Sequence, residues 1–164
     1  MSFMRQVSQV LDTEHRASLE LLGRVEKFFA RSSRAGAARD PEFASLAAGF
    51  VRLIEQDIAR HFDFEEREVF TRLAESGEGD IADLLSYEHE VMRAVAAEIL
   101  PLAREAAAGT LAEAAFEDLK RGALEMVERQ VSHIQKETMA LLPMLDHLID
   151  DETDRTLAFA YASA

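Results

Sequence analysis

The feature of this sequence that most constrains its fold is a helical periodicity that continues along almost the whole chain. Apolar residues recur every three or four positions, Ala, Leu, Glu and Arg dominate, and no stretch alternates as a half-buried strand does. Short polar breaks at 31–40, 76–80 and 109–110 divide this pattern into long segments. We therefore expect long helices over roughly 3–31, 41–75, 81–107 and 110–150.

Residues with strong conformational preferences predict where these helices begin or bend. Asp40, which precedes a proline, predicts a helix start, because Asp caps free N–H groups and proline fits the first turn. Thr110 and Glu113 have the spacing of a capping box and predict the start of the last long helix. Pro101 and Pro143 should bend or locally interrupt their helices, since proline lacks an N–H donor and clashes with the preceding turn.

Helices joined by short loops pack as antiparallel neighbours. The sequence therefore predicts an all-α fold, an up-down-up-down antiparallel four-helix bundle with a short C-terminal helix through Leu157 and Tyr161. We expect the bundle to occupy residues 1–150 and the tail or short helix residues 151–164. With 164 residues the chain has the length of one ordinary domain.

Composition excludes several kinds of site and partner. The chain has no Cys, which excludes thiolate metal sites, iron–sulfur clusters and cysteine nucleophiles, so any metal must use His and carboxylate ligands. The net charge is −13, and such an acidic surface argues against nucleic acid and membrane as partners. Because we find neither a signal peptide nor a run of about 20 apolar residues, we expect a cytoplasmic protein.

Four histidines fall one to each predicted long helix, and each interrupts an apolar stripe that should face the core. These are His15, His61, His89 and His133. Two of them carry a carboxylate one turn later: His61 is followed by Glu65, and His133 by Glu137. Side chains four positions apart share a helix face, so both members of each pair reach the same layer of the core.

The spacing places all six of these side chains at one height in the bundle. Residues at one height in antiparallel helices lie symmetrically about the loop between them. His15 and position 63, the centre of the first His–Glu pair, are symmetric about position 39. Position 63 and His89 are symmetric about 76, and His89 and position 135 are symmetric about 112. Each midpoint lies in or close to a polar break.

The chain also repeats this pattern after 72 to 74 residues. The repeated elements are Glu14-His15 with Glu88-His89, and His61-x-x-x-Glu65 with His133-x-x-x-Glu137. Two helical hairpins that each carry a His and then a His-x-x-x-Glu pair imply a pseudo-twofold core.

A metal site explains such a layer better than an ordinary polar core does. A single inward His is most often a core imidazole bonded to a neighbour, but burying six polar groups is costly unless they pair or bind a metal. Mutually hydrogen-bonded His–Glu pairs without metal are the alternative. Imidazole with carboxylate suits Fe, Mn or Zn, and six ligands exceed what one tetrahedral Zn needs.

Two metal ions, most simply two iron ions with Mn or Zn as alternatives, would satisfy this ligand set. The two glutamates would bridge both ions. One ion would be held by His15 with His61 and the other by His89 with His133. A bridging oxo or hydroxo group would bring each ion to five ligands and leave a position for O2, peroxide, NO or water.

Other polar residues near the layer have less specific interpretations. Asp57 and Glu68 are either partners of the histidines or part of a solvated face. Arg93 either pairs with an acid such as Asp57 or guards the metal pocket. The fifth histidine, His147, lies too far along its helix to join the layer, and we expect it at a helix end with Asp151.

The ordered pattern His, His-x-x-x-Glu, His, His-x-x-x-Glu resembles the hemerythrin-like (HHE cation-binding) domains. The resemblance runs from His15 to Glu137 and includes the Glu65-Glu66 doublet common in the family. It implies a non-haem di-iron centre that binds O2 or reacts with it. In some members of the family such a centre senses iron or oxygen, or handles peroxide or NO.

This chain departs from the respiratory hemerythrins at two positions. They carry a fifth His one turn after the third-helix His, where this chain has Arg93. Their last helix ends the set with His-x-x-x-x-Asp, where this chain has His133-x-x-x-Glu137. Without the fifth His both irons should keep an open position, which favours redox reactivity or sensing over reversible O2 carriage.

Three kinds of function remain open on the sequence. The leading one is a cytoplasmic di-iron protein that binds or reacts with a small oxidant (O2, peroxide or NO), for example a peroxide-reactive oxidoreductase. The second is an iron or oxygen sensor, or a metal store, that acts through a partner. The third is a metal-free helical interaction module that uses the tail at 157–161, which would also be the contact in an oligomer.

Overall fold

The structure, a computed structural model, describes residues 2–32 and 34–164. Almost all of these residues are helical, and the described residues contain no strand. Four rods form the body of the molecule, and the first is the single helix α1 (Gln6–Arg31). The second rod joins α3 (Pro41–Arg52), η1 (Leu53–Ile58), α4 (Ala59–Phe64), η2 (Glu65–Phe70) and α5 (Thr71–Glu75).

The third rod is α6 (Gly79–Ala107). The fourth rod joins η3 (Glu113–Ala115), α7 (Phe116–Lys136), η4 (Glu137–Leu141) and α8 (Leu142–Leu148). Two shorter helices complete the structure: α2 (Arg34–Ala37) lies in the loop after α1, and α9 (Asp151–Ala162) follows the fourth rod.

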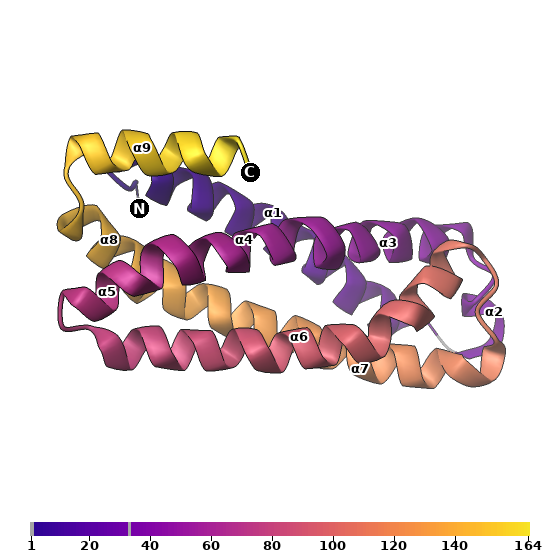
Figure 1. Ribbon diagram of the computed structural model, residues 1–164. Coiled ribbons are helices and arrows are strands. Elements are labelled where there is room, and N and C mark those ends of the chain that lie inside the picture. Colours follow the sequence, from indigo (N-terminus) through magenta and orange to yellow (C-terminus); the bar gives the residue numbers. More distant parts are fainter. Residues whose placement is uncertain (1, 33) are drawn as a thin grey trace.

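The rods form the predicted bundle. Figure 1 shows them side by side and running alternately in opposite directions, with α9 lying along the start of α1. Helices α1 and α6 each pack against both α3 and α7, so each rod contacts its neighbours in chain order. The predicted C-terminal helix is therefore confirmed as α9. None of the helices in the described residues is long and apolar enough to span a membrane.

The predicted start of the second rod is confirmed. The Asp40 side chain accepts a hydrogen bond from the Glu42 backbone N–H at 2.9 Å, and Pro41 occupies the first turn of α3. The cap satisfies one of the N–H groups that a helix start leaves free.

The capping box predicted at Thr110 and Glu113 is wrong, because Thr110 belongs to the end of α6. Its backbone N–H donates to the Glu105 carbonyl at 2.9 Å, and its hydroxyl lies 3.3 Å from the same oxygen. The preceding Gly109 has a φ of +72°, the left-handed conformation that lets a chain turn back onto the last carbonyls of a helix. The fourth rod begins only after this turn.

The two prolines inside predicted helices have different effects. Helix α6 continues through Pro101, and Figure 1 shows its C-terminal turns bending away from the axis of its longer first part. Pro143 lies in the first turn of α8, directly after the π-helical segment η4. Proline has no N–H to donate to the carbonyl four residues earlier, so it bends a helix from inside and is tolerated in a first turn.

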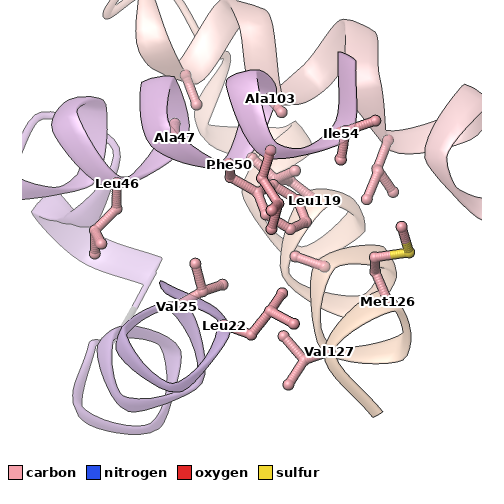
Figure 2. Packing of buried hydrophobic residues seen from close by; sticks show 14 of the residues in the cluster. Leu22, Val25, Leu46, Ala47, Phe50, Ile54, Ala103, Leu119, Met126 and Val127 are labelled. Carbon is pink, nitrogen blue, oxygen red and sulfur yellow. The ribbon is translucent and has the colours of Figure 1, made fainter. Parts of the chain in front are cut away.

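The apolar core is divided into two clusters. The larger one lies towards α2 and includes Leu22, Phe50 and Met126, which Figure 2 shows packing between α1, α3 and α7. The smaller one includes Leu11 and Leu85 and lies at the end that carries both termini. The layer between the two clusters is polar.

The C-terminal segment holds the beginning of α1 in place. The Asp154 carboxylate accepts hydrogen bonds from the backbone N–H groups of Gln6 and Val7, both at 2.9 Å. The Asp146 carboxylate accepts from the two N–H groups just before α1, at 2.7 and 3.1 Å. These carboxylates satisfy donors that the helix start leaves free, so α9 is fixed to the rod that carries the first histidine.

Candidate metal centre

All six residues predicted to form the polar layer lie together between the two apolar clusters. They are His15 on α1, His61 on α4, Glu65 at the start of η2, His89 on α6, His133 on α7 and Glu137 at the start of η4. Each is at most 7% exposed. Each rod contributes at least one of these side chains.

Two halves of the layer can be distinguished, and the first half is formed by His15 and His61. Their Nε2 atoms lie 3.1 Å apart. His15 Nε2 lies 2.9 Å from Glu137 Oε2, and His61 Nε2 lies 2.9 Å from Glu65 Oε1. Both rings therefore point Nε2 into the layer.

The second half is formed by His89 and His133, whose Nε2 atoms lie 2.9 Å apart. His133 Nε2 lies 2.8 Å from Glu137 Oε1. His89 Nε2 lies 3.5 Å from Glu65 Oε2 and 3.8 Å from Glu137 Oε1. Each glutamate thus lies close to rings of both halves.

The layer offers two overlapping sets of metal ligands. The sets are His15, His61, Glu65 and Glu137, and Glu65, His89, His133 and Glu137. Within each set, one ligand atom of every residue lies within 4.8 Å of the others. Both glutamates belong to both sets.

Unpartnered oxygens show that these residues fit a metal. Both carboxylate oxygens of Glu65 and Oε1 of Glu137 are buried, and no donor in the described part of the chain hydrogen-bonds to them. Nε2 atoms of the rings lie 2.8–3.5 Å from them, but a neutral ring that donates its Nδ1 proton to an outer partner has no proton on Nε2. Beside neutral rings these buried oxygens would therefore lack a donor, which is costly, whereas a cation between the rings and the carboxylates would satisfy them.

The outward Nδ1 atom of each ring has its own partner. The partners are Glu14 for His61 (2.9 Å), Glu66 for His89 (2.8 Å), Glu88 for His133 (2.8 Å) and the Thr138 hydroxyl for His15 (3.3 Å). A partner on Nδ1 fixes the tautomer and the orientation of a ring, so that Nε2 can bind a metal.

Three of these Nδ1 partners are carboxylates, here called the outer carboxylates, and each of them pairs with a cationic side chain. The pairs are Glu14 with Arg60, Glu66 with Arg93 and Glu88 with Lys136. Glu14 also accepts a hydrogen bond from the Tyr161 hydroxyl on α9, which is 2% exposed. The C-terminal helix therefore reaches the surroundings of the layer.

The structure decides between the interpretations that the sequence left open for the other polar residues. Asp57 is exposed, and Glu68 pairs with Arg72 at 3.3 Å, so neither is a hydrogen-bond partner of the histidines. Arg93 pairs with Glu66 at 2.7 Å instead of Asp57, and it lies outside the ligand layer. His147 is exposed and lies outside the layer.

The true outer partners were missed, although the sequence held a signal for them. Glu14 and Glu88 directly precede the first histidine of each hairpin, and Glu66 and Thr138 directly follow the two glutamates. Adjacent helix residues point about 100° apart. A residue beside a ligand therefore reaches towards the neighbouring rod, where it meets that rod's histidine.

The described residues contain three π-helical segments, and two of them, η2 and η4, begin at the two glutamates. These two occupy equivalent positions in the two hairpins, in agreement with the predicted pseudo-twofold repeat, whereas η1 precedes His61 in the second rod. Such widened turns are frequent at functional sites.

In the metal-free protein, the carboxylates favour protonated rings. Burial lowers the pKa of His61, but the charge of Glu65 and the hydrogen bond with Glu14 raise it overall to about 10. Burial also lowers the pKa of His89, but Glu137 and Glu65 raise it overall to about 9. Burial raises the pKa of Glu137, but His133 holds it well below its usual range. A metal ion must therefore displace protons from these rings.

A cavity of about 220 Å³ adjoins the first half of the layer. Its lining includes His15 and His61, apolar side chains such as Ile58 and Phe62, and the side chain of Gln130. Gln130 is 4% exposed, and its Oε1 accepts no hydrogen bond from the described residues. The lining of the cavity therefore combines apolar side chains with a few polar atoms that lie beside two histidines.

A four-helix bundle with a buried layer of histidines and glutamates, drawn from all four rods, defines a helical metal-binding protein. The sequence model of the hemerythrin HHE cation binding domain matches residues 6–145, so the chain belongs to this family, as the resemblance predicted. Searches of curated proteins and of solved structures find no match. Helix α9 and its Tyr161 lie outside the matched region.

Proposed function

We propose that this chain is a non-haem di-iron protein whose polar layer binds or reacts with a small oxidant, namely O2, peroxide or NO. The observation that carries the proposal is the pair of overlapping four-residue ligand sets with unpartnered carboxylate oxygens. One ion would be held by His15 and His61, and the other by His89 and His133. Glu65 and Glu137 would serve both.

Two bound irons would supply one-electron redox chemistry and an open position for a small ligand. The protein's own groups do the remaining work. The outer carboxylates orient the rings, and the two apolar clusters limit access of water to the layer. The cavity of about 220 Å³ is smaller than the roughly 300–1,000 Å³ typical of pockets for larger organic ligands, which favours a small ligand.

A metal store or sensor is the second candidate. The observation in its favour is that the layer joins all four rods and separates the two apolar clusters. Metal binding would therefore stabilise the whole bundle, because a ligand that binds only the folded state shifts the folding equilibrium. This candidate predicts a large rise in melting temperature with iron, without consumption of peroxide.

Metal content and absorption test the proposal. Protein purified without chelator is analysed for Fe, Mn and Zn, and its ultraviolet–visible spectrum is recorded before and after peroxide. We expect two iron ions per chain and near-ultraviolet charge-transfer bands that change with the oxidant. Protein that contains no metal and takes up no iron anaerobically would overturn the proposal and favour a metal-free interaction module.

Peroxide turnover then separates an enzyme from a binding protein or a store. Rapid evolution of O2 from peroxide by the iron-loaded protein, lost in Glu65→Ala, would identify an oxidoreductase. Glu90→Ala is the matched control, because Glu90 is an exposed glutamate on α6 that lies outside the layer. Peroxide that remains unchanged would select the binding or storage functions.

A further inference from the structure

The two halves of the layer are related by the sequence repeat, but their outer partners differ at one position. The repeat relates Glu14 to Glu88, and both hold the Nδ1 atom of a ring. It also relates Glu66 to Thr138, which follow the two layer glutamates. Here the symmetry is broken, because a carboxylate in one hairpin corresponds to a neutral hydroxyl in the other.

The second half of the layer has a carboxylate on each ring. Glu66 lies 2.8 Å from Nδ1 of His89, and Glu88 lies 2.8 Å from Nδ1 of the other ring. Arg93 lies 2.7 Å from Glu66, and Lys136 lies 2.6 Å from Glu88, so both carboxylates are held in place. Both rings of this half are therefore polarised and oriented.

The first half has weaker support. The Thr138 hydroxyl is neutral and lies 3.3 Å from Nδ1 of His15, longer than the 2.8–2.9 Å of the three carboxylate contacts. The other ring has a carboxylate, Glu14, which pairs with Arg60 as the carboxylates of the second half pair with their cations, and which also accepts a hydrogen bond from Tyr161. Because His15 has a neutral partner, one carboxylate polarises the rings of this half, against two in the second half.

We infer that the two halves bind metal unequally: the His89/His133 half takes the first ion, and the His15/His61 half holds a second, weaker and exchangeable ion. This inference rests on the proposed function, in which the layer holds two metals. A carboxylate on the outer N–H raises the basicity of the ligating nitrogen and fixes the ring. Loss of such a partner lowers metal affinity by about 10–100-fold, so we expect dissociation constants that differ by about this factor.

The weaker half is also the half that adjoins the cavity with Gln130. Metal exchange and ligand entry therefore occur on the same side of the layer. The second half is instead covered by aromatic side chains: Phe62 stacks on the His89 ring with centroids 3.6 Å apart, and Phe70 lies 5.3 Å from the same ring.

Stepwise titration of the metal-free protein with Co²⁺ under anaerobic conditions tests this inference. Calorimetry and the visible absorption of Co²⁺ should show two steps, separated by about 10–100-fold in affinity. With one equivalent of Zn²⁺, the ring NMR signals of His89 and His133 should shift before those of His15 and His61. Two equal steps, or the opposite order of shifts, would overturn the inference.

Reciprocal variants test the cause of the difference. Thr138→Glu should tighten the weaker step, and Glu66→Thr should loosen the tighter step by about 10–100-fold. Glu90→Thr is the charge-matched control, since it removes an exposed negative charge directly after His89 and should leave both steps unchanged. Equal effects of Glu66→Thr and Glu90→Thr would show that net charge, and not the ring contact, sets the affinity, and would overturn the inference.

The failure of this inference differs from the failure of the proposed function. A chain that takes up no Co²⁺, Zn²⁺ or iron at the layer contradicts both. A chain that takes up two ions with equal affinity contradicts only the inequality. Circular dichroism of each variant separates loss of the helical fold from loss of metal affinity.

Discussion

The close approach of α6 and α7 predicts that Gly122→Ala destabilises the bundle. A Cβ atom at position 122 would lie 2.2 Å from Cγ2 of Ile99 and 3.6 Å from its Cβ. Optimal carbon contacts are about 3.5–4.0 Å, and the β-branched Ile99 has little rotamer freedom within α6. The two helices must therefore separate or Ile99 must leave its preferred rotamer.

The expected magnitude is a balance of two effects. Replacing a mid-helix Gly by Ala stabilises a helix by about 1 kcal/mol. An extra methyl group in a packed contact costs about 1–3 kcal/mol, and the 2.2 Å contact favours the upper part of this range. We therefore expect a net loss of about 1–2 kcal/mol in the free energy of unfolding, or about 2–8 °C in melting temperature.

Gly23→Ala is the matched control, because Gly23 lies inside α1 and a Cβ there meets no atom within 4 Å. It should stabilise the protein by about 1 kcal/mol. Urea unfolding of the two metal-free variants measures the difference. Both positions lie more than two turns from the nearest layer histidine, so both variants should keep the metal stoichiometry of the parent. A Gly122→Ala protein that is as stable as Gly23→Ala would refute the packing argument.

Three further predictions concern the site and the C-terminal segment. The pKa of His61 is raised to about 10 and that of His89 to about 9 in the metal-free protein, and the pKa of His133 is raised as well, so metal binding at pH 7 should release at least two protons, measured by calorimetry in two buffers of different ionisation enthalpy; no proton release would contradict the raised values. Glu14→Gln should weaken Co²⁺ binding by about 10–100-fold through the His61 ring, while the exposed Glu20→Gln should not, and equal affinities would contradict the role of Glu14. Asp154→Ala should lower the free energy of unfolding by about 1–2 kcal/mol, because it removes the acceptor for two N–H groups of α1, and unchanged urea unfolding would argue against this cap.

The sequence predicted those features that depend on periodicity and height. The i,i+4 spacing of His61 and Glu65, and the symmetric positions of the histidines about the polar breaks, were enough to bring six side chains into one layer. Asp40 was predicted correctly as a helix cap, because the hydrogen bond of a cap joins residues that are close together in the sequence. These features depend on helix geometry alone, which a sequence specifies directly.

The helix boundary near Gly109 was predicted wrongly because two local signals compete there. The Thr110 and Glu113 spacing resembled a helix start, but the left-handed Gly109 turns the chain so that Thr110 ends α6. The outer partners of the rings reach across to neighbouring rods, so they could be inferred only by extending the predicted register from the ligands to the residues beside them. The π-helical turns at the two glutamates were also not predicted, and such turns are rare inside α-helices.

Anomalous diffraction from crystals of the iron-loaded protein at the iron absorption edge would show directly whether the polar layer binds two iron ions. We expect two anomalous peaks inside this layer, one beside the Nε2 atoms of His15 and His61 and the other beside those of His89 and His133. Both peaks should lie next to the carboxylates of Glu65 and Glu137. A layer without an anomalous peak, or iron bound only elsewhere on the acidic surface, would contradict this expectation.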